Sequence, residues 1–273
     1  EHRDASDAEK KIAEINTGFI AARADFLFSA LAEITPANAQ KELYLTDIVG
    51  IAAKRGTPAA ARLADDATEL EGINDRVQLA AQETALFKRV ARAHMLEGVT
   101  ILHPGSVRID PRAKIGADTV IHPRVELRGA VVLGRECVVD TGSVIQDSTL
   151  GDGVTVKPYC VIDKARAANG CIIGPFANLR PEAELAEGVH IGNFVEVKKS
   201  TIGKGSKANH LAYLGDATIG AGVNVGAGTT VTEDVAPGAL ALTRPEQKQV
   251  AGFAARFRAK GEKAKAAKKK EGA

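Results

Sequence analysis

Two cations and a histidine interrupt a run of aliphatic and glycine residues in the second half of the chain. Arg180 and Lys198 lie about one repeat apart, and His210 follows within the polar segment 204–216. Guanidinium and ammonium groups donate charge-assisted hydrogen bonds to phosphate oxygens. An imidazole titrates near neutral pH, which suits a general base. These residue types therefore predict a site for a phosphorylated ligand beside a basic nitrogen.

Tyr213 and Asn224 extend this polar set. Residues about one repeat apart stack along one edge of a repetitive fold, so we expect Arg180, Lys198, Tyr213 and Asn224 to line one shallow face. The alternative reading is structural. Lysines and arginines at corners are usually solvated, and a single histidine is more often a hydrogen-bonded structural residue. Residue types and spacing alone leave both readings open.

The elements that position these residues follow from a six-residue repeat between residues 115 and 231. A step of six misses the 3.6-residue face of a helix, whereas three units of one short strand and one turn close a triangular coil. The pattern predicts a parallel β-helix with the aliphatic side chains inside. The repeating aliphatic positions are Ile115, Ile121, Leu127, Leu133, Val139, Ile145, Leu150, Val156, Ile162, Ile173, Leu179, Leu185, Ile191, Val197, Ile202, Ile219, Val225 and Val231.

Glycines and spacing changes mark the corners of this predicted coil. A glycine follows many of the aliphatic residues, as in Gly116, Gly134 and Gly203, and we expect it to permit a tight corner. Steps of five residues, such as Ile145 to Leu150, read as single-residue deletions at a corner, which a solenoid tolerates.

Composition narrows the classes of function. The 273 residues carry 36 basic and 34 acidic side chains, a net charge of +2, which argues against nucleic acid as a partner, and no apolar run is long enough for stable membrane insertion. Aromatic residues make up 4% and tryptophan is absent, as an aliphatic core requires. The three cysteines, Cys137, Cys160 and Cys171, lack metal-ligand spacing, so we expect buried thiols in a reducing cytoplasm.

The first hundred residues and the last forty are organised differently. Helical spacing predicts short helices over 22–34, 45–53 and 59–63, a charged helical start over 7–15, and a long helix over 77–96 that ends at Gly98. A basic tail over 251–270 predicts a solvated helix. The expected domains are a helical N-terminal region over 1–78, a linker helix over 79–98, the β-helix over 99–236 and a tail over 237–273.

Long segments of the chain resemble one enzyme family. The run IGNFVEVKKSTIGKGSKANHLAYLGDATIGAGVNVGAGT at 191–229 is similar to the acetyltransferase half of the bifunctional N-acetylglucosamine-1-phosphate uridyltransferase/glucosamine-1-phosphate N-acetyltransferases. The segments 1–18, 42–49, 71–79 and 173–185 resemble the same family. The resemblance implies a left-handed β-helix that forms a cytoplasmic homotrimer, with acetyl-transfer sites between subunits. It also implies acetyl transfer from acetyl-CoA to glucosamine 1-phosphate, followed by uridylyl transfer from UTP with Mg²⁺, for UDP-N-acetylglucosamine and cell-wall synthesis.

The family's site residues carry over by motif. The resemblance implies that His210 is the catalytic base, that Arg180 and Lys198 bind the sugar phosphate, and that Tyr213 and Asn224 bind the sugar. Ala227 and Arg244 match positions that contact acetyl-CoA. In the first region, taken as the remnant of a nucleotidyltransferase domain, Glu1, Asn16 and Asn74 match uridyl-sugar ligands, and Asn74 also matches a magnesium ligand.

Two departures from the family bear on activity. The chain begins at Glu1 and its one methionine is Met95, so we expect a fragment that lacks the glycine-rich nucleotide loop and the magnesium aspartate, without uridyltransferase activity. After Thr229 the sequence passes directly to a segment that resembles the family's last coil, so we expect an internal deletion that removes sugar and acetyl-CoA contacts. Three hypotheses remain: an acetyltransferase, a uridyltransferase, and a non-catalytic trimeric scaffold that retains sugar-phosphate binding.

Overall fold

A computed structural model describes residues 5–12, 14, 16–38, 40–57, 59–243 and 249–259. The chain divides into two compact units, Glu1–Lys88 and Arg89–Ala273. Most of the secondary structure belongs to the second unit, where short parallel strands repeat from residue 100 to residue 241. The predicted domain boundaries at 78/79 and 98/99 remain predictions.

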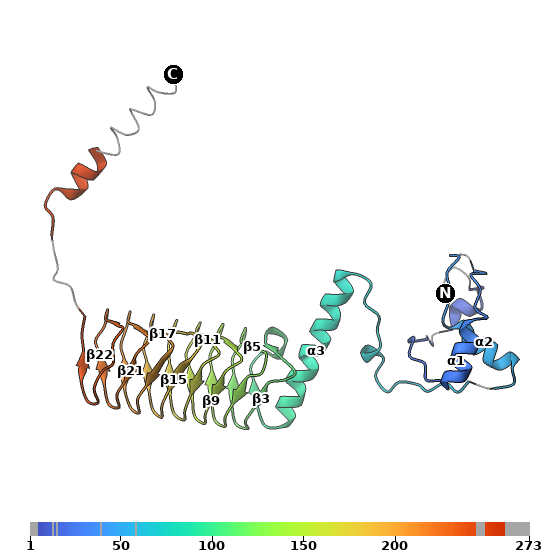
Figure 1. The fold of residues 1–273 in the computed structure, drawn as a ribbon, viewed down its shortest axis with the longest axis horizontal. Helices are drawn as coiled ribbons and strands as arrows, with labels where there is room; N and C mark the ends of the chain where they lie inside the picture. The colour runs from blue at the N-terminus through green and yellow to red at the C-terminus, as the bar shows by residue number, and fades with distance from the viewer. Residues whose placement is uncertain are drawn as a thin grey trace, which may run out of the picture. The chain divides into compact units, whose positions relative to one another are not determined.

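The second unit is a left-handed parallel β-helix, as the repeat and the family resemblance predicted (Figure 1). Its strands form three parallel sheets, which we call sheets A, B and C, and equivalent positions are 16 to 20 residues apart in sheet A. Sheet A contains, in spatial order, β1 (Thr100–Ile101), β4 (Val120–Ile121), β7 (Val138–Val139), β10 (Thr155–Val156), β13 (Ile172–Ile173), β16 (His190–Ile191), β19 (Lys207–Ala208), β22 (Asn224–Val225) and β24 (Leu240–Ala241).

Sheets B and C complete each triangular coil. Sheet B contains β2 (Arg108–Ile109), β5 (Glu126–Arg128), β8 (Val144–Gln146), β11 (Val161–Asp163), β14 (Asn178–Leu179), β17 (Glu196–Lys198), β20 (Tyr213–Gly215) and β23 (Thr230–Val231). Sheet C contains β3 (Lys114–Ile115), β6 (Val132–Leu133), β9 (Thr149–Leu150), β12 (Arg166–Ala167), β15 (Ala183–Leu185), β18 (Ser200–Ile202) and β21 (Thr218–Ile219).

The interior of the β-helix is the aliphatic ladder that the sequence predicted. Every repeating aliphatic position is buried, at 9% relative exposure or less. Polar side chains inside the ladder bond to the backbone of adjacent coils. Thr119, for example, donates from Oγ1 to the carbonyl of Gly134 at 2.9 Å and accepts from the amide of Cys137 at 3.1 Å. The buried hydroxyl is therefore satisfied and adds a tie between coils.

The glycines have a different role from the predicted one. Gly116 and Gly203 do not have positive φ values; a Cβ atom at either position would lie 2.5 Å from backbone atoms of the next coil. The left-handed conformation occurs instead at non-glycine corner residues such as Asp118 and Glu136. Glycine at 116 and 203 therefore permits close approach of coils rather than a strained corner.

The β-helix continues without a break through Thr229, where the sequence departs from its family. Tyr213 of β20 pairs in parallel with Thr230 of β23, and Asn224 of β22 pairs with Leu240 of β24. The strands on both sides of the junction keep the register of the earlier coils. The β-helix ends at β24, so the predicted end at residue 236 falls before its last strand.

Helix α3 (Arg76–Leu96) confirms the predicted long helix, and the chain leaves it through Gly98 at φ +93°. Its last turns belong to the second unit, where Ala91 is fully buried and packs into the β-helix core. A short 3₁₀ helix, η3 (Pro104–Ser106), lies in the first coil. The end of α3 therefore covers the core at its N-terminal end.

The first unit contains two predicted helices, α1 (Ala24–Leu31) and α2 (Asp47–Lys54). Ala30, Ile48 and Ile51 form its small buried core. Two short 3₁₀ helices, η1 (Glu9–Lys11) and η2 (Ala67–Glu69), complete its elements.

Two expectations for the short helices were wrong. The segment 59–63 is exposed and not helical, because a five-residue segment cannot offset the cost of helix nucleation without packing. The expected start over 7–15 is reduced to the single turn η1. In the tail, residues 253–259 are helical, and the rest of the predicted helix lies outside the described residues. No helix within the described ranges is long and apolar enough to cross a bilayer.

Candidate functional site

Three of the predicted ligand residues come together on sheet B. Leu179, Val197 and Leu214 occupy one register position on β14, β17 and β20, so Arg180 and Lys198, which follow the first two, lie on neighbouring coils. The amide of Arg180 donates to the carbonyl of Val197 at 2.8 Å. Adjacent coils are about 4.8 Å apart, which places the two cationic side chains within reach of one phosphate group.

Each of these cations is paired with a carboxylate. Arg180 Nη1 donates to Glu196 Oε1 at 2.8 Å, and Lys198 Nζ lies 3.6 Å from Asp216 Oδ2. The hydrogen bond from Glu196 raises the pKa of Arg180, with a smaller contribution from nearby Tyr213. Both cations are partly exposed, at 45% and 40% of their side-chain surface. A phosphate would compete with carboxylates that solvent already screens.

His210 lies at the corner between sheets A and B. It follows β19 and precedes β20, and its side chain is exposed. Its Nδ1 contacts Oδ1 of Asn193, one coil earlier. Gly228 donates its amide to the carbonyl of His210 at 2.9 Å, so Ala227 occupies the equivalent corner one coil later. The structure therefore brings the predicted base close to one predicted acetyl-CoA contact.

Asn224 does not lie on the face that carries Arg180, Lys198 and Tyr213. It belongs to β22 in sheet A, where it pairs with Lys207. The expectation of one shared face was wrong for this residue, because spacing of about one repeat does not specify which of three sheets a position joins. His190 also lies in sheet A; burial lowers its pKa, and Lys157, Lys207 and His210 lower it further.

The remaining predicted residues are not gathered into a site. Glu1 and Arg244 lie outside the described residues. Asn16 accepts a hydrogen bond from the amide of Gly18 at 2.7 Å, and the amide of Asn74 donates to Gln78 Oε1 at 2.6 Å; both side chains are exposed. Within the described residues, no group of three or more His, Cys, Asp or Glu side chains could hold a metal ion. The residues around Asn74 do not fit a magnesium site, and we derive no step through one.

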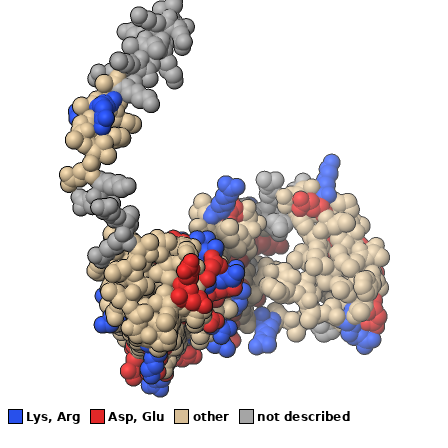
Figure 2. Space-filling view, turned by 60° about the vertical axis from the view of Figure 1, so that its left-hand side comes forward, with Lys and Arg blue, Asp and Glu red and all other residues tan. Residues whose placement is uncertain are grey.

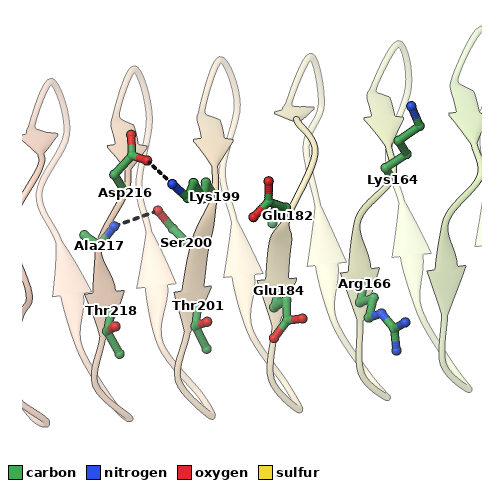
Figure 3. Close-up of a pocket in the computed structure, with 11 residues that line it drawn as sticks. Lys164, Arg166, Glu182, Glu184, Lys199, Ser200, Thr201, Asp216, Ala217 and Thr218 are labelled. Carbon is green, nitrogen blue, oxygen red and sulfur yellow. Dashed lines mark hydrogen bonds and ion pairs between the residues drawn. The ribbon is translucent and has the colours of Figure 1, made fainter.

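A shallow groove of about 550 Å³ lies over sheet C and its corner with sheet B, apart from these residues (Figure 3). Basic and acidic side chains alternate along it from coil to coil, and Lys199 Nζ lies 3.6 Å from Asp216 Oδ1. Figure 2 likewise shows acidic and basic side chains intermixed on the visible face of the β-helix. Opposite charges at this spacing neutralise each other, so the groove does not single out one charged ligand. Its charged lining residues are Lys164, Arg166, Glu182, Glu184, Lys199 and Asp216.

The sequence analysis missed three residues that contact the predicted site. Glu196 and Asp216 pair with the two cations, and Asn193 contacts the histidine. Alternation would have found Glu196, since residues two apart on a strand share a face and Glu196 precedes Lys198 by two. Asn193 and Asp216 required the coil length to be known residue by residue, because both belong to corners of variable spacing.

Comparisons with known proteins identify relatives over most of the chain. No family model matches it. The chain is similar to proteins named bifunctional protein GlmU: 51% identical over 229 residues to that of Anaeromyxobacter dehalogenans (strain 2CP-C), covering 84% of this chain and 46% of the relative. The relative from Shouchella clausii (strain KSM-K16) is 46% identical over 235 residues, covering 86% of this chain and 52% of the relative. The chain thus spans about half the length of these relatives.

A third relative bears on the internal deletion. The GlmU of Sorangium cellulosum (strain So ce56) is 43% identical over 303 residues, covering 95% of this chain and 63% of the relative. That alignment is longer than the 273-residue chain, so it places residues of the relative opposite gaps in this chain. Among solved structures, the Arabidopsis UDP-N-acetylglucosamine acyltransferase has a TM-score of 0.43 at 13% identity, covering 55% of this chain and 68% of that one.

Proposed function

We propose that this chain, whose sequence is related to that of bifunctional GlmU proteins over most of its length, transfers an acetyl group from acetyl-CoA to the amine of glucosamine 1-phosphate. The observation that carries the proposal is the arrangement on sheet B. Arg180 and Lys198 lie on neighbouring coils, Tyr213 begins the next strand of that sheet, and His210 lies at the corner from which that strand starts.

The geometry supports a direct acetyl transfer. Arg180 and Lys198 would hold the phosphate of the sugar and so fix the position of its amine. Acetyl-CoA supplies the thioester. His210 would accept the proton that the amine loses as its nitrogen attacks the thioester carbonyl, and coenzyme A leaves as the thiol. Ala227 lies one coil beyond His210 and would contact the acetyl-CoA.

We further propose that the active form is a homotrimer in the cytoplasm, as the family resemblance implies. The position of Asn224 supports this assembly. On a single chain it faces outward from sheet A, away from the cations of sheet B. A neighbouring copy that presents sheet A to sheet B would bring an Asn224 toward Arg180 and Lys198.

The test is release of free thiol from acetyl-CoA. We expect release that depends on glucosamine 1-phosphate and that falls at least 100-fold in His210→Ala, which removes the general base. His122→Ala is the matched control, since His122 is a partly exposed histidine near a corner of an early coil, paired with Asp140 at 3.5 Å. Thiol release that is independent of the sugar phosphate, or unchanged in His210→Ala, would contradict the proposal.

The second candidate function is a non-catalytic trimeric scaffold that retains sugar-phosphate binding. The absence of residues opposite part of the Sorangium relative favours it, because the family resemblance places sugar and acetyl-CoA contacts in the segment that this chain lacks. Calorimetric titration separates the two candidates. The enzyme binds both glucosamine 1-phosphate and acetyl-CoA, whereas the scaffold binds the sugar phosphate alone and shows no turnover. For both candidates we propose that uridylyl transfer is lost, and pyrophosphate release from UTP and N-acetylglucosamine 1-phosphate would contradict this.

A further inference from the structure

The neighbour of His210 at the corner between sheets A and B breaks a pattern. In successive coils, the carbonyl of one corner residue accepts a hydrogen bond from the amide of the residue that follows the equivalent position in the next coil. We call this series the corner column. Its members are Pro123, Thr141, Pro158, Pro175, Asn193, His210 and Ala227.

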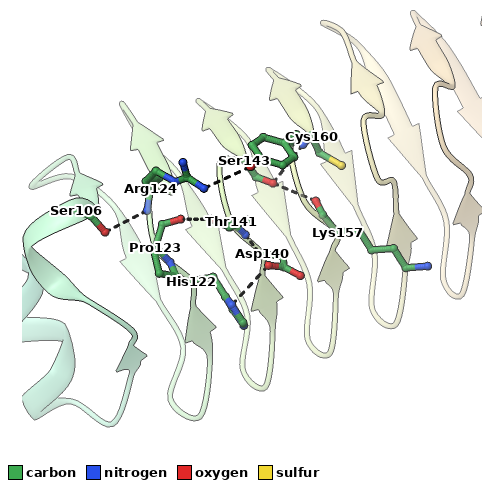
Figure 4. A network of polar contacts seen from close by, with 10 residues as sticks. Ser106, His122, Pro123, Arg124, Asp140, Thr141, Ser143, Lys157 and Cys160 are labelled. Atoms are coloured by element: carbon green, nitrogen blue, oxygen red, sulfur yellow. Dashed lines mark hydrogen bonds and ion pairs between the residues drawn. The ribbon is translucent and has the colours of Figure 1, made fainter.

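Proline and threonine fill the corner column in the coils before Asn193. Proline suits the position, because its fixed φ stabilises the corner and no amide hydrogen is needed there. Thr141 satisfies its own hydroxyl by donating to the carbonyl of Pro123 at 2.7 Å, as Figure 4 shows. The amide side chain of Asn193 appears one coil before the histidine and contacts it. The corner does not require an amide at position 193, but the histidine can use one.

The contact has a chemical consequence for the imidazole ring. Asn193 Oδ1 contacts Nδ1 of His210, and an amide oxygen only accepts hydrogen bonds. Nδ1 therefore carries the proton. In the neutral ring Nε2 then holds the free lone pair, since a hydrogen bond at one imidazole nitrogen decides which tautomer is present. A general base needs this lone pair directed at the proton it removes.

We infer that Asn193 is a positioning residue that holds the neutral His210 ring in its Nδ1–H tautomer, with Nε2 free to accept the proton of the acceptor amine. This inference rests on the proposed function for its purpose, but not for its measurement. The tautomer is a property of the resting protein and can be observed without substrate. A neutral amide keeps the same hydrogen bond to the protonated ring, so Asn193 would hold the ring in place throughout the proton transfer.

The experiment is nitrogen-15 NMR of the full-length chain labelled at histidine. The ring signals of His210, one of six histidines, are assigned with His210→Gln. We expect the neutral ring of the unsubstituted chain to show the Nδ1–H tautomer. In Asn193→Ala we expect a shift toward the Nε2–H tautomer, and in Asn193→Asp we expect the Nδ1–H tautomer to be retained because a carboxylate is also an acceptor. Thr141→Ala removes the other polar side chain of the corner column and should leave the signals of His210 unchanged.

Kinetics give an independent readout. In the thiol assay, Asn193→Ala should lower kcat about tenfold, less than loss of the base itself, with the KM for glucosamine 1-phosphate changed less than twofold. An Nε2–H tautomer in the unsubstituted chain, or signals unaffected by Asn193→Ala, would overturn the inference. If the unsubstituted chain shows no turnover, the proposed function fails while the NMR result still decides the role of Asn193. Should Asn193→Ala not fold, Asn193→Thr replaces it, because Thr141 shows that the corner column accommodates threonine.

Discussion

At the residue scale, the two cations on sheet B make a prediction about substrate binding. Arg180→Ala and Lys198→Ala should each weaken binding of glucosamine 1-phosphate about tenfold, because each removes one charged donor to the phosphate. Arg128→Ala is the matched control, since Arg128 lies at the equivalent end of β5 and pairs with Glu126 at 2.6 Å. Titration calorimetry at low and moderate salt measures the effect. Equal weakening in Arg128→Ala would show that the loss is one of general charge.

The thiol of Cys160 makes a second prediction at this scale. Burial raises its pKa to about 11, against 9.0 for a free thiol. Its contribution to the free energy of unfolding is therefore complete below pH 9. It is lost between about pH 9 and 11, because the unfolded chain loses the thiol proton first. We expect a steeper fall in stability over this range than in Cys160→Ala, measured by denaturant unfolding. Identical pH dependence in the two proteins would contradict the prediction.

At the element scale, each coil depends on close contact with the next. Gly203→Ala should destabilise the β-helix by about 1–3 kcal/mol, because the new Cβ would lie 2.5 Å from the backbone of the following coil. Gly105→Ala is the matched control, since it has nothing within 4 Å and no positive φ. Thermal unfolding followed by circular dichroism compares them. A neutral Gly203→Ala would mean that the coils can separate at low cost.

The same scale shows what the sequence predicts and what it leaves open. The aliphatic ladder was predictable because a buried position every six residues has one geometric solution, and each such side chain is buried. The placement of Asn224 on sheet A was not, since one skipped residue at a corner moves every later position relative to the sheets. The carboxylates that pair with Arg180 and Lys198 were missed for a related reason: side-chain pairing across coils depends on rotamers as well as on register.

At the scale of the whole molecule, the junction after Thr229 separates architecture from chemistry. The solenoid closes over it because every coil presents the same ladder to its neighbours, and Val225 and Val231 are both buried. A binding site has no such redundancy, because each ligand contact comes from one position. A repeat protein can therefore lose coils and keep its fold while losing part of a site, which is why we place the acetyltransferase and the scaffold under one binding experiment.

The two units also differ in how much core holds them together, and this predicts separate unfolding. The first unit buries Ala30, Ile48 and Ile51 in its cluster, whereas the second buries a continuous ladder along the β-helix. Calorimetry of the full chain should show two transitions, with the first unit unfolding at the lower temperature. Ile48→Ala should lower only the first midpoint. Ile162→Ala, which removes about 2–5 kcal/mol from the ladder, should lower only the second. A single transition shifted by both substitutions would show instead that the units unfold as one cooperative body.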